Sequence, residues 1–233
     1  MRIIIARGME IVPEGIDLKH NETLRDAPRS PIKLHLCTPD LRKKACMTVE
    51  DMRRIVRMFW QYIEHRHLAV PALGGIPRVG EAFAFMLQRH VYEQTGRYIP
   101  VVRAEKIYHS DGTREIGRII HSAEYPTGDL WLIDDVVNWG RSKFEALNRY
   151  TQAGYRITDS LVAVDYGVNA AALFAKLHGR LHSLLPLDSI LMLGTREKSL
   201  DLGIIAQTKA YLAASRLANT ELPDLGRLVN KTA

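Results

Sequence analysis

The sequence predicts an α/β protein in which helices flank a mostly parallel sheet. Four short apolar segments, typical of buried strands, alternate with segments whose apolar residues recur at helical spacing. Glycine-containing turns separate strands from helices. The composition, with 46% hydrophobic and 25% charged residues, is that of an ordinary globular protein. Units of this kind build parallel sheets, and ligands bind at the carboxyl ends of their strands.

A small N-terminal lobe is expected over residues 1–47, as a hood on the core. This region mixes proline, charge and short apolar runs, and Ser30 to Leu36 alternates in polarity like a half-buried strand. Thr48 and Asp51 have the spacing of a capping box. They open a helix over residues 52–66, in which one apolar face is expected to pack on a sheet through Ile55, Met58, Phe59 and Tyr62.

The core is expected over residues 48–218, followed by a C-terminal tail over residues 219–233. Gly96 and Gly154 mark the ends of two of its helices. The stretch 103–128 is polar with little periodicity, which predicts a functional or mobile loop. We expect strands at residues 68–70, 99–102, 130–133 and 160–164, and helices at residues 79–94, 142–150, 170–177 and 203–218.

Bulk properties exclude several classes of protein. No apolar run approaches the roughly 18 residues that cross a bilayer, and the first apolar stretch is too short for a signal peptide. We therefore expect a cytoplasmic protein without a membrane partner. Cys37 and Cys46 do not have the spacing of a disulfide framework or a zinc site and are interpreted as free thiols. A net charge of +6 suits phosphates, nucleic acid or an acidic metabolite.

The segment LWLIDDVVNWGRS, residues 130–142, carries the strongest chemical pattern. Asp134 and Asp135 follow four apolar residues where a buried strand emerges, and adjacent side chains there point to opposite faces. A helix start follows, whose free N–H groups and dipole favour an anion such as phosphate. The alternative is that the two aspartates only cap or solvate a turn. The candidate phosphate ligands are Asn138, Gly140, Arg141 and Ser142.

Two other segments are candidates for binding an anion. Gly74 and Gly75 precede a predicted helix, where residues without a Cβ let backbone N–H groups approach a ligand closely. An ordinary strand-to-helix turn is an equal alternative, and Arg78 nearby either adds charge or lies exposed. The polar stretch contributes cations, with solvation by water as the alternative interpretation. These cations are Arg103, Lys106 and His109.

Together these segments resemble the type I phosphoribosyltransferases, most closely the orotate branch. LWLIDDVVNWGRS is similar to the family motif for phosphoribosyl diphosphate (PRPP), in which four apolar residues precede two acids and a phosphate-binding turn. Three further segments resemble parts of the orotate branch in the same order along residues 24–194. LRDAPRSPIKLHL resembles its N-terminal segment, VPALGGIPRVGEAFA its diphosphate-contacting loop, and VRAEKIYHSDGTREIG its mobile loop.

The resemblance implies the type I phosphoribosyltransferase fold and transfer of a 5-phosphoribosyl group from PRPP to a ring nitrogen of a base, with orotate as leading candidate. It implies Mg²⁺ as cofactor, held by PRPP near Asp134 or Asp135 with no direct protein ligand, and a homodimer. Asp134 and Asp135 would orient ribose beside the cationic sugar carbon of the transition state. Lys106 and His109 are the other catalytic candidates, with His109 a proton donor to diphosphate. Arg25, Gly74, Gly75 and Arg103 join the phosphate ligands as substrate-binding residues.

Several residues depart from the orotate branch. Arg25 replaces a lysine, Lys33 and Leu34 replace aromatic residues near the base, and Ala104 replaces a second loop lysine. Tyr166 stands where the branch has an arginine that meets the orotate carboxylate, so a base without a carboxylate stays open. Trp139 is bulky for the phosphate turn, and its ring is expected to block the pocket, fold outward or pack against a partner.

Two hypotheses from different classes follow. The first is a PRPP-dependent transferase acting on orotate or a related base. The second is a catalytically weakened relative that binds PRPP or a nucleotide and regulates another process. A nucleic-acid-binding version of the second ranks low, because no helix-turn-helix, zinc-finger or RNA-binding motif occurs in the sequence.

Overall fold

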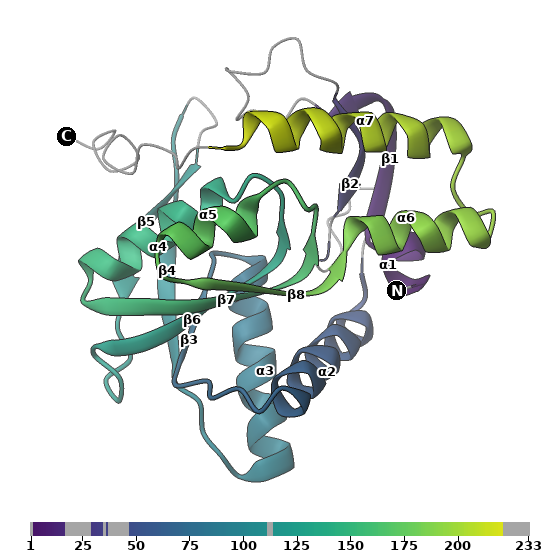
Figure 1. The fold of residues 1–233 in the computed structure, drawn as a ribbon. Coiled ribbons are helices and arrows are strands. Elements are labelled where there is room, and N and C mark those ends of the chain that lie inside the picture. The colour runs from purple at the N-terminus through teal and green to yellow at the C-terminus, as the bar shows by residue number, and fades with distance from the viewer. Residues whose placement is uncertain (1, 17–28, 35, 37–46, 111–113, 221–233) are drawn as a thin grey trace.

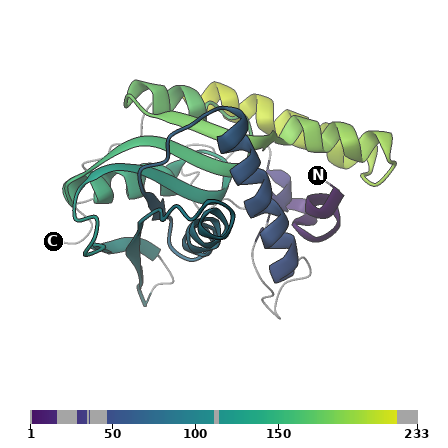
Figure 2. The same ribbon diagram turned by 90° about the horizontal axis from the view of Figure 1, so that it is seen from below.

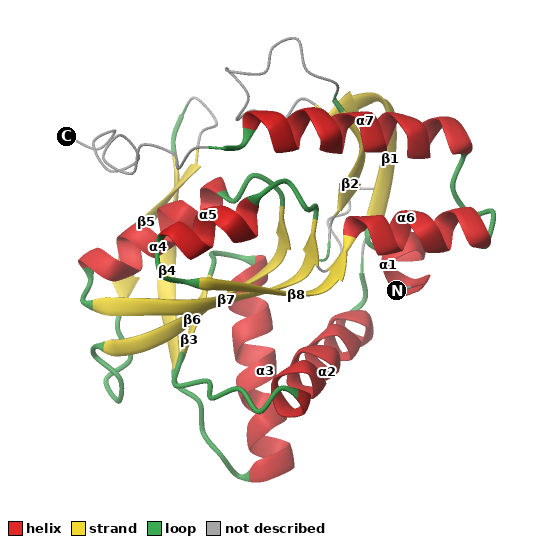
Figure 3. Cartoon of the chain, viewed as in Figure 1, coloured by secondary structure: helices red, strands yellow, loops and turns green. Residues whose placement is uncertain are grey.

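A six-stranded sheet forms the centre of the computed structural model, which describes residues 2–16, 29–34, 36, 47–110 and 114–220 (Figures 1 and 3). Its strands are β3 (Leu73–Gly75), β4 (Val101–Tyr108), β5 (Arg114–Ile120), β6 (Gly128–Val137), β7 (Tyr155–Asp165) and β8 (Arg180–Pro186). They lie in the order β5-β4-β3-β6-β7-β8. All pair in parallel except β5, which is antiparallel to β4. The predicted mostly parallel sheet is confirmed.

Helices cover both faces of this sheet (Figures 1 and 2). α2 (Val49–His65) and α3 (Val79–Thr95) lie on one face, and α4 (Arg141–Gln152) and α5 (Ala170–Lys176) lie on the other. On the first face Phe59 meets Phe83 edge-on, with 5.6 Å between ring centroids. On the second Phe144 stacks on Phe174 at 5.1 Å. Each face thus carries its own apolar layer. None of the helices in the described ranges is long and apolar enough to span a bilayer.

Elements from the two ends of the chain meet beside the sheet. The chain begins with α1 (Arg2–Arg7). The next element, β1 (Met9–Ile16), pairs antiparallel with β2 (Ser30–Leu34). α6 (Leu187–Arg196) and α7 (Leu202–Ala218) follow β8, and α7 packs against β2 (Figure 1). Ile32 of β2 and Leu212 of α7 belong to the same buried cluster as α2 and α3. The hood therefore shares its core with the C-terminal helix, while domain boundaries at residues 47 and 218 stay a prediction.

The first core strand begins later than the sequence predicts. A strand at residues 68–70 is wrong, because the pairing starts at Leu73, which lies opposite both Val101 and Trp131. Val70 is fully buried, but the next residue, Pro71, has no N–H for a ladder. Burial at Val70 therefore reflects packing rather than sheet pairing.

Much of the predicted loop at residues 103–128 is a β-hairpin instead. β4 continues to Tyr108, and β5 returns antiparallel beside it. Their register shifts between Ala104 and Lys106, and such a bulge interrupts the period-2 alternation by which strands are recognised. Ile116 and Ile119 of β5 are buried on either side of the shift. The polar stretch thus contains a hairpin with a bulge, so the expectation of a loop without strands is wrong, while its functional or mobile character stays a prediction.

β8 and α6 have no counterpart among the predicted elements. β8 lies at the edge of the sheet, and most of its residues are only partly buried. His182 occupies the middle of β8, where its ring stacks on Trp131 at 5.2 Å and its Nε2 lies 2.7 Å from Asp159 Oδ1. A polar residue at a packed position interrupts the apolar pattern by which a strand is recognised in the sequence.

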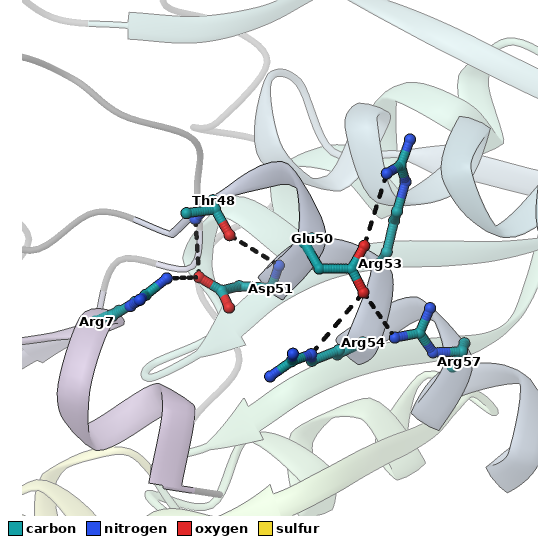
Figure 4. Close-up of polar contacts among 7 residues, drawn as sticks. All are labelled: Arg7, Thr48, Glu50, Asp51, Arg53, Arg54 and Arg57. Atoms are coloured by element: carbon teal, nitrogen blue, oxygen red, sulfur yellow. Dashed lines mark hydrogen bonds and ion pairs between the residues drawn. The ribbon is translucent and has the colours of Figure 1, made fainter.

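The predicted capping box at the start of α2 is confirmed (Figure 4). The Thr48 hydroxyl accepts from the Asp51 N–H at 3.1 Å, and the Asp51 carboxylate accepts from the Thr48 N–H at 2.9 Å. Arg7 of α1 donates to the same carboxylate at 3.1 Å, which ties the hood to α2. Burial opposes ionisation of Asp51, yet these hydrogen bonds outweigh it and lower the pKa of its carboxyl. The neighbouring exposed carboxylate, Glu50, pairs instead with Arg53, Arg54 and Arg57.

Candidate functional site

The acid pair (Asp134 and Asp135) lies at the carboxyl end of β6, against the start of α3. Gly75 of β3 lies opposite Ile133 in the sheet. A Cβ on Gly80 of α3 would lie 2.1 Å from the Ile133 carbonyl oxygen and 3.2 Å from the Asp134 Cα. The turn after β3 and the turn after β6 therefore meet at one edge of the parallel sheet, where ligands bind in folds of this class.

Asp134 is held by a lysine from the next helix. Asp134 and Lys143 are 7% and 3% exposed, and Lys143 Nζ lies 2.5 Å from Asp134 Oδ2. The same ammonium donates to the Val136 carbonyl and lies 3.5 Å from Ser142 Oγ. The carboxylate predicted to meet a ribose is thus already neutralised by a cation of the protein.

Lys143 is not among the predicted site residues, although the sequence holds a signal for it. Lys143 and Arg141 both fall in the first turn of α4, which holds no acidic residue. Cations are unfavourable at a helix N-terminus because the helix dipole is positive there. Two of them in one first turn indicate an anionic partner, which for Lys143 is Asp134.

Asp135 is only partly buried, and its Oδ1 accepts from the Val136 N–H at 2.8 Å. Burial, and next the neighbouring Asp134 charge, raise the pKa of Asp135 to about 7, although Lys143 acts in the opposite direction. At neutral pH this carboxyl therefore exists in both protonation states. It can accept a hydrogen bond from a sugar hydroxyl as a carboxylate or donate one as an acid.

The phosphate turn (residues 138–142) leads from β6 into α4. Gly140 is the N-cap of α4 with φ 82° and ψ 0°, a left-handed conformation that glycine adopts without steric cost. No side chain caps this helix, and the first N–H groups of a helix have no intrahelical partner. Arg141 and Ser142 are exposed beside them. The predicted ligands Gly140, Arg141 and Ser142 thus surround an open helix N-terminus that suits a phosphate.

Asn138 and Trp139 of the turn pack toward α7. Asn138 Nδ2 donates to the Tyr211 hydroxyl at 2.7 Å, and the Trp139 ring packs against the main buried cluster. In the described part of the chain, the buried Asn138 Oδ1 has no hydrogen-bond partner, and the Tyr211 hydroxyl also interacts with Trp139 and Ser215. Trp139 therefore does not fold outward, and the amide of Asn138 is engaged with α7.

Close packing surrounds the two glycines of β3. A Cβ on Gly75 would lie 2.3 Å from the Glu81 Cα, and a Cβ on Gly74 would lie 2.7 Å from Leu130 Cδ2. Contact with α3 and with β6 accounts for both glycines, in line with the ordinary strand-to-helix turn. Their contact with diphosphate stays a prediction.

Two contacts attach the β4–β5 hairpin to the start of α3. Arg103 forms an ion pair with Glu81, and the Arg78 guanidinium carbon lies 5.1 Å from the centroid of the Tyr108 ring. Arg78 has φ 86° and ψ −87°, a conformation that costs a non-glycine residue about 1–3 kcal/mol. Such strain is common at functional sites, and it lies in the turn that resembles the diphosphate loop.

The other predicted cations are spread along the hairpin. Lys106 lies partly buried on β4. His109 is exposed just beyond β4, where its Nε2 lies 3.7 Å from Glu115 Oε1. Arg25 lies outside the described residues. The structure therefore places Arg103 beside the acid-pair edge and His109 toward the hairpin tip, and their roles stay predictions.

Tyr166, at the position of the carboxylate-binding arginine in the orotate branch, is committed to the fold. It is 5% exposed, and its hydroxyl donates to the Ile32 carbonyl of β2 at 3.2 Å. Burial raises its pKa. This residue joins the hood to the sheet rather than presenting a donor to a base.

The residues around the acid pair do not fit a magnesium ion. Mg²⁺ prefers several oxygen ligands in octahedral geometry, but the Asp134 carboxylate is paired with Lys143. Within the described ranges, no three histidine, cysteine or acidic side chains are arranged to hold a metal. A divalent ion bound directly by Asp134 would have to displace a buried ammonium. An ion held by PRPP near Asp134 or Asp135 stays a prediction.

Comparison with known proteins identifies the fold. No protein-family model matches the sequence. The chain is 22% identical over 161 residues to uridine 5'-monophosphate synthase of Bos taurus, covering 69% of this chain and 32% of that protein. The solved UMP synthase of Leishmania donovani matches at a TM-score of 0.64 and 20% identity, covering 91% of this chain and 41% of that one. Orotate phosphoribosyltransferase of Aeropyrum pernix matches at a TM-score of 0.52 and 19% identity, covering 80% of this chain and 89% of that one.

The chain thus spans less than half the length of these two synthases. Matches over 80% or more of this chain show that it has the type I phosphoribosyltransferase fold, as the sequence predicts.

Proposed function

We propose that this chain is a PRPP-dependent phosphoribosyltransferase. The observation that carries the proposal is the β6 edge, where the acid pair leads through Gly140 into the uncapped start of α4. A phosphate at this helix start would accept hydrogen bonds from backbone N–H groups, with Arg141 and Ser142 beside it. The ribose of the same molecule would then extend toward Asp135.

The reaction replaces one bond at the sugar. A ring nitrogen of the base gives up its proton and forms a bond to C1 of PRPP. The bond from C1 to diphosphate breaks with its electron pair on the leaving oxygen, and the proton goes to diphosphate or to water. Positive charge develops on the sugar, which a nearby Asp135 carboxylate stabilises. The diphosphate charge is met by cations of the hairpin and the β3 turn, which are Arg78, Arg103, Lys106 and His109. Because the residues at Asp134 do not fit Mg²⁺, we assign the metal no role there.

Orotate is the base that we propose, because the matched proteins are named as orotate phosphoribosyltransferase and UMP synthases. Tyr166 is engaged with Ile32, so a carboxylate on the base would need another partner. We further propose that the chain acts in the cytoplasm as a homodimer. Sedimentation of the purified chain tests the dimer, and a monomer at all concentrations would contradict it.

Diphosphate release from PRPP tests the transferase directly, with orotate and a panel of other bases as acceptors. We expect release with one base, and a fall of about 100-fold in kcat for Asp135→Asn, which removes the charge near the sugar. The matched control is Asp129→Asn on the same strand. It loses only an exposed ion pair with Arg156 and should keep full activity. Equal activity of both variants would contradict the role of Asp135.

A second candidate is a protein that binds PRPP or a nucleotide without transferring it. The ion pair between Lys143 and Asp134 favours this candidate, because it neutralises one of the two carboxylates that resemble the ribose-binding acids. Titration calorimetry with PRPP distinguishes the two. Binding of PRPP without diphosphate release from any base would support the binding protein over the transferase.

A further inference from the structure

Lys143 lies where a cation is costly, so its position requires an explanation. It falls in the first turn of α4, next to the positive end of the helix dipole, and its side chain is 4% exposed. Burying an ammonium without a partner costs several kcal/mol. Asp134 offsets this cost at 2.5 Å. The sequence therefore places a cation where Asp134, near the end of β6, neutralises it.

The donors of Lys143 are only partly used. An ammonium has three N–H groups. One is directed to Asp134 and one to the Val136 carbonyl. The remaining neighbour is Ser142 Oγ at 3.5 Å, which is at the long limit for a hydrogen bond. This long contact with Ser142 is the weakest of the three, and an oxygen of a ligand held at the phosphate turn would take its place as acceptor.

The charge around this ammonium leaves little attraction for a second cation. Lys143 cancels the charge of Asp134, and the raised pKa of Asp135 reduces the remaining negative charge near neutral pH. Asp165 ends the neighbouring strand β7, and burial raises its pKa as well. A divalent ion would meet a monovalent cation already in place and few charged oxygens to bind.

We infer that Lys143 is the resident cation of the phosphoribosyl site, in place of a divalent metal at Asp134, so that PRPP binds to the β6 edge without Mg²⁺. This inference rests on the proposed function. The ammonium orients Asp134 and donates its third N–H to the ligand. Lys143 is thus a binding and positioning residue of the site rather than a structural counterion.

Titration calorimetry with PRPP, in Mg²⁺ and in EDTA, tests this role. For the unchanged chain, we expect dissociation constants within about threefold of each other in the two buffers. Lys143→Gln keeps amide donors for Asp134 and Val136 but removes the charge. We expect it to bind PRPP about tenfold or more weakly in EDTA and to regain affinity with Mg²⁺. Lys143→Arg should restore binding in EDTA. Lys176→Met, on the exposed side of α5, should behave like the unchanged chain.

The outcomes separate this inference from the function on which it rests. If the unchanged chain binds no PRPP in either buffer, the proposed function fails and the inference with it. If EDTA abolishes PRPP binding to the unchanged chain, or if Lys143→Gln stays independent of Mg²⁺, only the role of Lys143 is overturned. Circular dichroism shows whether Lys143→Gln folds, and if it does not, the EDTA result for the unchanged chain decides alone.

Discussion

At the scale of single residues, Asp135 links the candidate site to folding stability. Its pKa in the folded chain, about 7, lies above the ordinary value of 3.8, so the folded state binds the proton more tightly than the unfolded state. This contribution to stability is complete below about pH 4 and is lost as the pH rises to about 7, at no more than about 1.4 kcal/mol per pH unit. Acids with lowered pKa values, such as Asp159, change the folding stability only at pH values below this range.

The free energy of unfolding should therefore fall between about pH 5 and pH 8, and Asp135→Asn should flatten this fall. Asparagine resembles the protonated carboxyl, so the variant should equal or exceed the unchanged chain in stability at the upper pH. Urea unfolding at several pH values measures both profiles. Asp165, whose pKa is also raised, accounts for the slope that remains. Parallel profiles for the two proteins would show that Asp135 titrates normally.

Gly75 tests whether close packing accounts for the glycines of β3. A Cβ there would lie 2.3 Å from the Glu81 Cα, and backbone cannot move aside as a flexible side chain can. We expect Gly75→Ala to lower the free energy of unfolding by about 1–3 kcal/mol. Gly179→Ala is the matched control, because its Cβ would meet Phe174 at an ordinary 3.5 Å. Urea midpoints compare them, and equal midpoints would contradict the packing role.

The site could be predicted from the sequence where its residues are contiguous. Asp134 to Ser142 form one strand end, one turn and one helix start, so local rules place them together. Lys143 was missed although it adjoins them, because its partner is determined by how α4 turns back over β6. Tyr166 was compared with a base-binding residue, but its hydroxyl reaches a strand 134 positions away. Such pairings depend on the tertiary fold rather than on local pattern.

At the scale of elements, two adjacent acids at the start of α2 should behave differently. Asp51 is 3% exposed, completes the capping box and accepts from Arg7 of the hood. We expect Asp51→Ala to lower the free energy of unfolding by about 1–2 kcal/mol. Glu50→Ala removes only exposed ion pairs with arginines, which contribute little, and should leave the midpoint unchanged. Thermal unfolding compares the two variants, and a larger loss in Glu50→Ala would contradict the cap.

Helices with clear caps were predictable, and edge strands were not. α2 and α3 begin and end near the predicted residues because Thr48, Asp51 and Gly96 give local signals for a start or a stop. β5 of the hairpin and β8 lie at the two edges of the sheet, where each strand has one pairing partner and mixed burial. A bulge in β4–β5 and a packed His182 in β8 remove the alternation that marks a strand.

At the scale of the whole molecule, the class of sheet could be predicted, but the packing of the C-terminal helix against the hood could not. Alternation of strands and helices is a property of consecutive segments, and this alternation predicted the parallel sheet. The packing of α7 against β2 joins segments from opposite ends of the chain, and no local pattern encodes such a contact. One buried cluster extends from Ile4 through α2 and α3 to Leu212, so the hood and the sheet should unfold together.

Leu212 of α7 tests this coupling. It is 1% exposed within the shared cluster, and Leu212→Ala should cost about 2–5 kcal/mol by removing buried methyl groups and leaving a cavity. Leu217→Ala on the same helix is the control, since Leu217 is 82% exposed. Urea unfolding followed by circular dichroism and by tryptophan fluorescence, which comes from Trp60, Trp131 and Trp139, should give coincident curves shifted together in Leu212→Ala. If the fluorescence midpoint stayed in place while helix signal was lost early, α7 would unfold apart from the sheet and the cluster would not be one cooperative unit.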